Sequence, residues 1–255
     1  MIGDSRYVEP VTADHDEDIT GLQLAGRAVA EARDAMLAVA APGVSTAELD
    51  AVGREVLDRH GARPAPPTVG FPAATCVSVN QEAAHGIPSS ERLLREGDLL
   101  NVDVSAELHG YWADTGASHA VGAVSPAARR LLDATRLANR DALTAARAGA
   151  PLRHIGRAVQ RRARKHGFSV IENLNGHGTG RDLWEPPSVS SYEDPRDRTK
   201  LWEGLVLAIE PFLSTGATWA DEADDGWTLL TPGHLTAQFE HTVVVRNGEP
   251  LVLTA

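Results

Sequence analysis

Five residues of the types that bind metal ions stand in separate short motifs along this 255-residue chain. Four are carboxylates and one is an imidazole: Asp103 in NVDVS, Asp114 in ADTGAS, His177 in GHGTG, Glu210 in AIEPF and Glu240 in AQFEHT. An oxygen-rich donor set of this kind suits two divalent cations that share a water or hydroxide. The residue types therefore predict two divalent ions, and they do not distinguish among Mn, Fe, Co and Zn.

The first two carboxylates can be placed relative to each other by strand geometry. The segment LLNVDVSA alternates polar and apolar residues, which is typical of a strand, and His109-Gly110 fits a two-residue hairpin turn. That turn would place Asp114 opposite Ser105 and diagonal to Asp103 on the same face, roughly 7–8 Å apart. Two solvated acids are the alternative interpretation, but inward-facing acids on an apolar strand resist joint ionisation unless a cation is present.

Longer segments around these residues carry a family resemblance. They read CVSVNQEAAHGIP at 76–88, NVDVSAELHGYWADTGAS at 101–118, GHGTGRDLWEPP at 176–187, AIEPF at 208–212 and AQFEHT at 237–242. In order and spacing, the chain resembles the type I methionine aminopeptidases from about residue 18 to its end. The five-ligand pattern alone is shared with prolidase, Xaa-Pro aminopeptidase and creatinase relatives. The CVSVN and HGIP segments favour the methionine aminopeptidase branch, as does the absence of a large N-terminal domain.

The resemblance implies the pita-bread fold, an α/β (α+β) architecture, and a division of the ligands between two ions. His177 and Glu210 would hold one ion, Asp103 would hold the other, and Asp114 and Glu240 would bridge them. This division is chemically reasonable because carboxylates can span two ions, whereas one neutral imidazole cannot.

The resemblance also implies catalytic and substrate-binding roles. Glu210 would help to move the proton of the nucleophilic water, and His85 in HGIP would donate to the peptide nitrogen or carbonyl. The apolar pocket for the first side chain would be formed by residues at matching or near-matching positions: Phe71, Cys76, Leu183 and Trp227. The family's usual aromatic residue is missing at Thr68, and its small thiol is missing at Ala65.

One position departs from the family pattern in a way that concerns the substrate. The family continues GHG-x-G-R with two residues and then His-Glu-x-Pro, and that second histidine touches the substrate. Trp184 stands at this position here. An indole donates one hydrogen bond, and it neither accepts one nor exchanges a proton near neutrality. We therefore count Trp184 among the substrate-binding residues and expect weak cleavage of ordinary Met-Ala peptides.

Composition bounds the class of protein and its partners. Apolar residues make up 42% of the chain and charged residues 23%, which is ordinary for a soluble globular protein. The formal net charge of −11 argues against binding to nucleic acid or to an anionic membrane. Cys76 is the single cysteine, so no intrachain disulfide can form. With no signal-peptide pattern and no apolar stretch of membrane-spanning length, we expect a cytoplasmic monomer that acts on a peptide or peptide-like substrate.

The organisation of the chain follows from its helix and turn signals. Residues 1–17 are expected to form an acidic arm, and 18–255 a single catalytic domain. Helices are predicted over 18–40, 45–60 and 126–146. Segment 41–61 weakly resembles segment 147–167, which ends in the same His-Gly pair; a pseudo-twofold pair of units is one explanation, and coincidence between two similarly capped helices is the other. Strands are predicted near 74–80, 98–106, 111–121, 168–174, 205–212, 235–246 and 250–253.

The sequence favours a dinuclear metal-dependent aminopeptidase that hydrolyses the first peptide bond and removes N-terminal methionine. Two alternatives stay open. Trp184 motivates a divergent dipeptidase or aminoacyl-amide hydrolase of a dedicated pathway. A catalytically weak binding protein with the same fold is the other, although a pure binder has no need of four clustered acids.

Overall fold

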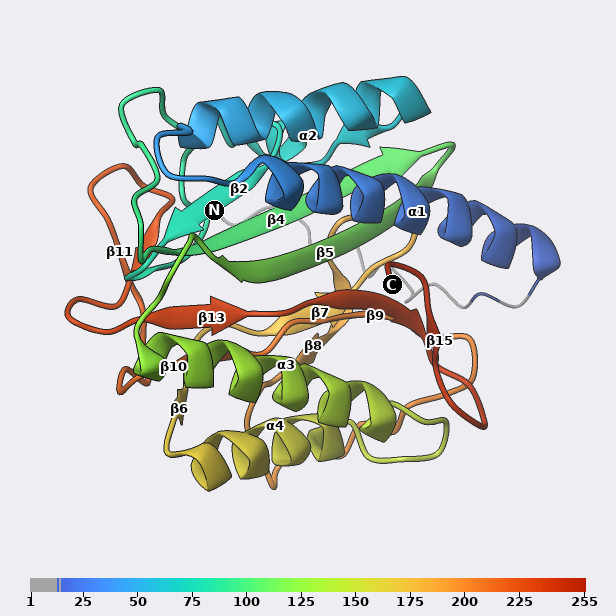
Figure 1. Cartoon of the computed structure of the whole chain (residues 1–255). Helices are drawn as coiled ribbons and strands as arrows, with labels where there is room; N and C mark the ends of the chain where they lie inside the picture. The colour runs from blue at the N-terminus through green and yellow to red at the C-terminus, as the bar shows by residue number, and fades with distance from the viewer. Residues whose placement is uncertain (1–12, 14) are drawn as a thin grey trace, which may run out of the picture.

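The computed structural model describes residue 13 and residues 15–255, and it places antiparallel sheets between two pairs of helices (Figure 1). The pair α1 (Asp16–Val39) and α2 (Thr46–His60) covers one side of the molecule. The pair α3 (Pro126–Ala145) and α4 (Arg153–His166) covers the opposite side. This is the arrangement of two helix-pair units that the internal repeat predicts.

The ends of the first two helices show how local signals set their limits. The helix predicted over 45–60 is confirmed as α2, and Ser45 caps it: the Ser45 hydroxyl accepts from the Glu48 N–H, and the Glu48 carboxylate accepts from the Ser45 N–H. Gly61 ends this helix in the left-handed conformation, with φ of 70°. Helix α1 begins at Asp16, two residues before the predicted start, and its cap residue His15 makes no side-chain capping bond. The acidic first turn of α1 instead complements the positive end of the helix dipole.

Most of the predicted acidic arm, namely residues 1–12 and 14, lies outside the described residues. Within the described part, Ala13 is buried, and its N–H donates to the carbonyl oxygen of Gly204 at 2.8 Å. The chain just before α1 is therefore attached to the C-terminal half of the fold.

The N-terminal half contributes a four-stranded antiparallel sheet. Its strands are β1 (Arg63–Pro64), β2 (Cys76–Val79), β4 (Leu99–Leu108) and β5 (Tyr111–Ala120), with β4 between β1 and β2 and also paired with β5. The predicted hairpin is confirmed, since Asp114 pairs with Ser105 and Gly116 pairs with Asp103. His109 and Gly110 adopt φ of 55° and 82°, the positive values that a tight hairpin turn requires.

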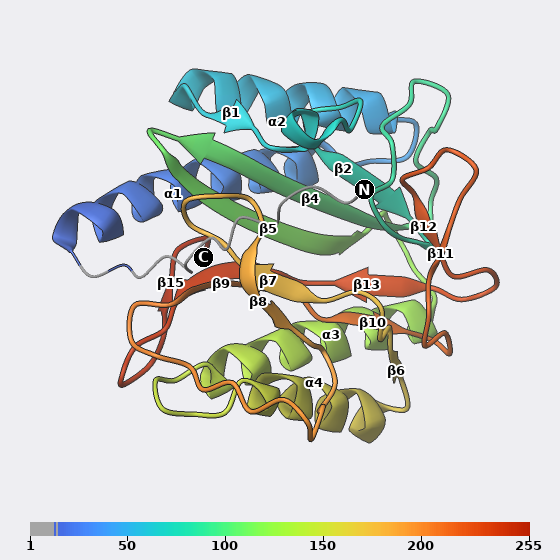
Figure 2. The same cartoon turned by 180° about the vertical axis from the view of Figure 1, so that it is seen from behind.

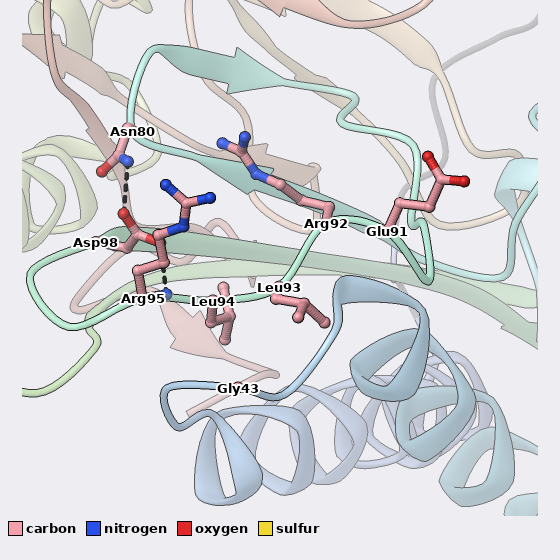
Figure 3. Close-up of a pocket in the computed structure, with 8 residues that line it drawn as sticks. All are labelled: Gly43, Asn80, Glu91, Arg92, Leu93, Leu94, Arg95 and Asp98. Atoms are coloured by element: carbon pink, nitrogen blue, oxygen red, sulfur yellow. Dashed lines mark hydrogen bonds between the residues drawn. The ribbon is translucent and has the colours of Figure 1, made fainter.

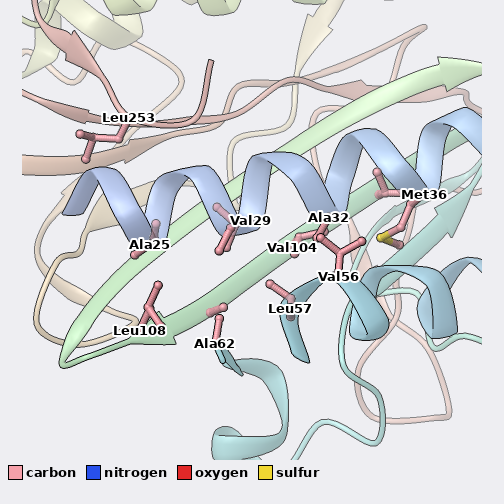
Figure 4. Packing of buried hydrophobic residues seen from close by; sticks show 14 of the residues in the cluster. Ala25, Val29, Ala32, Met36, Val56, Leu57, Ala62, Val104, Leu108 and Leu253 are labelled. Carbon is pink, nitrogen blue, oxygen red and sulfur yellow. The ribbon is translucent and has the colours of Figure 1, made fainter. Parts of the chain in front are cut away.

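Helix α1 packs on this sheet through small and medium apolar residues spaced three and four apart. Ala25, Val29, Ala32 and Met36 face the apolar side of β4, where Val104 lies (Figure 4). Because α1 covers this face, the alternate residues of β4, which include Asp103, point to the other face of the strand. A second core lies under α3 and α4, and it includes Leu131, Ile155, Leu207, Leu213 and Val243.

The C-terminal half consists of two further antiparallel sheets. The five-stranded sheet has the order β15 (Leu251–Val252), β14 (His241–Val244), β9 (Val206–Ile209), β7 (Gly176–Gly178) and β8 (Glu185–Val189). The three-stranded sheet has the order β13 (Thr236–Gln238), β10 (Phe212–Ser214) and β6 (Ser169–Val170). Seen from behind in Figure 2, β7 and β8 lie across the middle of the molecule, between the two helix pairs.

Two predicted long strands are interrupted, and the interruptions matter. The prediction of one strand over 205–212 is wrong, because β9 ends at Ile209 and β10 begins at Phe212. The prediction of one strand over 235–246 is wrong in the same way, because β13 ends at Gln238 and β14 begins at His241. Pro211 lacks an N–H for a strand ladder, which helps to explain the first break. At each break the chain passes from one sheet to the other, and a glutamate stands in the gap.

The remaining elements are short. They are the 3-10 turn η1 (Pro66–Val69) and a small sheet of β11 (Asp221–Glu222), β12 (Leu229–Leu230) and β3 (Glu82–Ala84). The sequence did not predict β1, β3, β7, β8, β11 or β12, and the predicted strand over 168–174 is reduced to β6. Among the described residues, no helix is long and apolar enough to cross a membrane.

Candidate metal centre and substrate pocket

The five predicted ligand residues converge from five different strands or strand ends. Asp103 lies on β4, Asp114 on β5 and His177 on β7, while Glu210 and Glu240 stand in the two strand breaks. Ligand atoms of Asp114, His177 and Glu240 all lie within 4.8 Å of one another, and those of Asp103, Glu210 and Glu240 do the same. Glu240 thus belongs to both groups.

Distances around the imidazole connect the two groups further. His177 Nε2 lies 3.6 Å from Glu210 Oε1 and 3.8 Å from Asp114 Oδ2. His177 Nδ1 lies 2.9 Å from the Gly178 carbonyl oxygen, and since a carbonyl can only accept, Nδ1 is the nitrogen that carries the proton. The lone pair of Nε2 therefore faces the carboxylates, which is the orientation that a metal-binding histidine needs.

Burial strongly affects the charges of this cluster. Burial, followed by repulsion from neighbouring acids, raises the pKa of Asp114, Glu210 and Glu240 well above the usual carboxyl range. Burial also raises the pKa of Asp103. The same cause lowers the pKa of His177 to about 4, so its imidazole is neutral at physiological pH. The four acids can therefore be ionised together, beside a neutral imidazole, only if positive charge is bound among them.

The donor set fits divalent cations. Asp114 Oδ1 and Glu240 Oε1 are buried and have no hydrogen-bond partner among the described residues. Buried carboxylate oxygens without partners cost free energy unless a cation or water satisfies them. Their position inside a cluster of four acids and one imidazole suits hard divalent ions, so these residues could hold such ions.

Gln238 is a site residue that the sequence reasoning missed. Its Nε2 donates to Glu240 Oε2 at 3.0 Å, and it lies 3.4 Å from Asp103 Oδ2 and 3.5 Å from Glu210 Oε2. A Cβ on Gly116 would lie only 2.2 Å from Gln238 Oε1, so the glycine of ADTGAS makes room for this amide. The sequence held a signal for this residue, because Gln238 stands two residues before the predicted ligand Glu240. It was missed because an amide side chain is not among the usual metal-ligand types.

Asn139 is a second missed residue, and it acts on the backbone. This buried side chain of α3 donates to the carbonyl oxygens of Ile209 at 2.9 Å and Phe239 at 2.8 Å. Each acceptor directly precedes one of the two glutamates, so one amide holds both strand breaks. The available signal was a lone asparagine among buried apolar positions of the helix.

An apolar pocket of about 80 Å³ opens beside the carboxylates. Phe71 and Trp227 meet edge to face in its wall, with ring centroids 5.3 Å apart. Every predicted substrate-binding residue lines this pocket, together with four of the five predicted ligands: Phe71, Cys76, His85, Leu183, Trp184, Trp227, Asp103, Asp114, His177 and Glu210. Ala65 packs behind the wall with Trp112 and Leu183, and it does not line the pocket.

A larger cavity of about 420 Å³ lies elsewhere, between the loop before α2 and the segment that leads into β4 (Figure 3). Some of its polar groups have partners: Asn80 Nδ2 donates to Asp98 at 2.8 Å, and Arg92 pairs with Glu82 at 3.4 Å. None of the predicted site residues lines it. The size of a cavity is therefore not what marks the candidate site in this fold.

Comparison with known proteins agrees with the geometry. The chain matches metallopeptidase family M24 over residues 20–247. It belongs to this family. It is 46% identical to methionine aminopeptidase 2 of Bacillus subtilis over 94% of the chain and 98% of that protein. It is 44% identical to a methionine aminopeptidase of Staphylococcus epidermidis, over 94% of the chain and 96% of that protein.

The crystal structure of the methionine aminopeptidase from Thermotoga maritima superposes on this M24 chain with a TM-score of 0.93 and 32% identity. The match covers 96% of this chain and 99% of that one. The resemblance to methionine aminopeptidases and the α/β (α+β) pita-bread architecture are thereby confirmed. The relatives do not favour a divergent dipeptidase or a binding protein. Membership of a metallopeptidase family, together with the donor cluster, also supports the use of divalent metal by this chain.

The shared position of Glu240 leads to a prediction about metal content. Glu240→Gln should lower the bound metal more than Asp103→Asn, because Glu240 belongs to both ligand groups and Asp103 to one. Elemental analysis of the two purified variants after equal metal loading measures the difference. Equal metal loss in both, or none in Glu240→Gln, would contradict a shared role for Glu240.

The raised carboxyl pKa values give a prediction for metal-stripped protein. An acid whose pKa is higher in the fold than in the unfolded chain binds more protons when folded, so its contribution to stability is greatest below about pH 4 and falls as pH rises. Wild-type protein in chelator should therefore lose stability, relative to Glu240→Gln, as the pH rises above the ordinary glutamate pKa of about 4.3. Thermal unfolding at several pH values tests this. Parallel pH profiles for the two proteins would show that Glu240 does not carry the raised pKa.

Proposed function

We propose that this M24 peptidase is a methionine aminopeptidase that hydrolyses the first peptide bond of chains with a free amino terminus. One observation carries the proposal: the cluster of four carboxylates and one imidazole stands at the wall of an apolar pocket with room for one side chain. The methionine aminopeptidases to which the chain is similar support the same reading.

The metal ligands in this proposal are those that the sequence singles out. Two divalent ions, of which Mn, Fe, Co and Zn are candidates, would be held by Asp103, Asp114, His177, Glu210 and Glu240. When bound, such ions lower the pKa of a water molecule and polarise the scissile carbonyl. In this proposal His177 and Glu210 would hold one ion and Asp103 the other, and Asp114 and Glu240 would be available to both. The membership of Glu240 in both ligand groups supports its shared role, and the 3.6 Å between His177 Nε2 and Glu210 Oε1 supports placing those two residues on one ion.

Proton transfer falls to Glu210. Its carboxylate lines the pocket, and Oε1 lies 3.6 Å from His177 Nε2. A carboxylate at this place can accept the proton of the attacking water and pass it to the departing amine. The Gln238 amide, 3.5 Å from Glu210 Oε2, helps to fix the carboxylate orientation.

His85 contacts the reacting peptide bond. Its backbone is held in the left-handed region, with φ of 54°. The next residue, Gly86, donates its N–H to Ser78 Oγ at 3.0 Å and accepts from the Val77 N–H at 2.9 Å. The HGIP segment is therefore tied to β2, and His85 is fixed in the pocket wall, where a ring nitrogen can donate to the peptide nitrogen or carbonyl.

The pocket suits an uncharged, flexible first side chain such as methionine. Burial, followed by the nearby carboxylates, raises the pKa of the Cys76 thiol well above its ordinary value, so the thiol stays neutral and acts as an apolar wall. Phe71, Leu183 and Trp227 complete that wall.

We infer that the enzyme acts as a cytoplasmic monomer on peptide substrates. The net charge of −11 argues against partners that are nucleic acids or anionic membranes.

Peptide assays test the function directly. Metal-loaded enzyme should release methionine from Met-Ala-Ser, slowly because Trp184 replaces the substrate-contacting histidine, and leave N-acetyl-Met-Ala-Ser intact, with products identified by mass spectrometry. Release from the blocked peptide, or from neither, would contradict an aminopeptidase.

The role of His85 yields a separate prediction. His85→Ala should keep its metal but lose turnover by about 10²–10⁴-fold, as expected for a group that acts on the proton transfers of the reaction. His119→Ala, which changes a half-buried histidine outside the pocket, is the matched control and should keep its activity. Loss of metal or of folding in His85→Ala would instead indicate a structural role.

A further inference from the structure

Arg33 is a buried cationic residue outside the proposed metal site and the pocket. It lies on α1, which packs along β5 (Figure 1), and it is only 8% exposed. Its Nη1 donates to Thr115 Oγ1 at 2.7 Å and to the carbonyl oxygen of Thr254 at 3.0 Å. On its outer side, Nε donates to Asp34 Oδ1 at 2.9 Å. Because a buried ion pair can often be replaced by apolar residues without loss of stability, folding alone does not explain an arginine at this position.

Thr115 connects Arg33 to the backbone of Glu240. A threonine hydroxyl has a single hydrogen, and a guanidinium can only donate. The Thr115 oxygen therefore accepts from Arg33, and its own hydrogen points to the Glu240 carbonyl oxygen, 3.0 Å away. Hydrogen bonds that follow one another in this way polarise and strengthen each other. The direction of each bond from α1 to Glu240 is therefore fixed by the guanidinium.

Both backbone groups of Glu240 are held by β5. The Glu240 N–H donates to the Gly116 carbonyl oxygen at 2.8 Å, and the Glu240 carbonyl oxygen accepts from Thr115. Thr115 and Gly116 directly follow Asp114 in the sequence. Since Glu240 stands in the break between β13 and β14, these bonds set its distance from Asp114. A shift of Thr115 would therefore move the two carboxylates relative to each other.

The second inward bond of Arg33 leads to the backbone of Asp114. The Thr254 carbonyl oxygen accepts from Arg33, and the Thr254 hydroxyl oxygen accepts from the Thr242 N–H at 3.2 Å. Thr242 Oγ1 bonds both backbone groups of Asp114, at 2.7 and 2.9 Å. Thr115, Thr242 and Thr254 are each 0% exposed, so water does not compete for these bonds. One guanidinium is thus linked to the backbone of both carboxylates.

We propose that Arg33 is a positioning residue of the metal centre. Through Thr115 it holds the backbone of Glu240, and through Thr254 it supports that of Asp114. This rests on the proposed role of these two carboxylates as ligands available to both ions. Arg33 does not line the pocket, so it acts on metal affinity and coordination geometry without touching substrate. Partners behind metal ligands typically change metal affinity by about 10–100-fold.

Titration of the chelator-treated full chain with Co²⁺ tests this role, because the visible absorption of bound Co²⁺ reports its coordination geometry. Thr115→Val removes the hydroxyl that joins Arg33 to Glu240. It should bind Co²⁺ about 10–100-fold more weakly than wild type, with a changed spectrum at saturation. Thr115→Ser restores the hydroxyl and should recover the wild-type affinity and spectrum. Arg33→Met, which removes the donor of both branches, should weaken Co²⁺ binding by about tenfold or more.

Thr135→Val is the matched control, since Thr135 is also 0% exposed and its hydroxyl donates to the Leu131 carbonyl oxygen at 2.7 Å within α3. It should keep the wild-type Co²⁺ affinity and spectrum. Wild-type binding in Arg33→Met, or a loss in Thr115→Val that the control shares, would overturn the positioning role. If Glu240→Gln still loses Co²⁺, the proposed ligands stand in that case. Unchanged Co²⁺ binding in Glu240→Gln would overturn both the ligand assignment and the positioning role.

Discussion

The rest of the structure depends on keeping four carboxylates together at a place where water is largely excluded. Like charges at close range repel, and burial raises the cost of each one. The chain offers the cluster one neutral imidazole and the amide of Gln238, neither of which carries positive charge. Divalent cations are the remaining means of compensation within the chemistry of this family, so folding and metal binding are thermodynamically linked.

The fold holds the cluster through backbone geometry, and it does not surround the carboxylates with cationic side chains. The strand breaks at Glu210 and Glu240 put each glutamate where the chain changes sheets, free of the alternation that a continuous strand would impose. Asn139 then ties the residues before both breaks to one helix. Thr242 adds a similar link, because its hydroxyl donates to the Asp114 carbonyl at 2.7 Å and accepts from the Asp114 N–H at 2.9 Å. These hydrogen bonds fix the backbone that carries the ligands. They leave carboxylate oxygens free of protein donors, so that these oxygens can bind metal ions.

How much of this could be predicted from the sequence differs from one residue to the next. The mutual placement of Asp103 and Asp114 follows from a two-residue turn and strand alternation, which are local rules. The approach of His177, Glu210 and Glu240 does not, since their contacts span long separations; the resemblance of the motifs suggested it. The strand breaks were missed because both segments are largely apolar and appear continuous. Asn139 and Gln238 were missed because amides act here through geometry, which a residue type alone does not reveal.

Residues 177–184 carry both a candidate metal ligand and a residue of the substrate pocket, and the two can vary independently. His177 on β7 and Trp184 lie only seven residues apart. The first faces the carboxylates, with its tautomer set by the Gly178 carbonyl, and the second stands at the pocket mouth. Between them, the turn at Arg181–Asp182 is closed by the carboxylate of Glu185 and does not rely on either side chain. A substitution at position 184 can therefore alter the surface that meets the substrate while His177 keeps its place, because the bonds that hold the loop are independent of the indole.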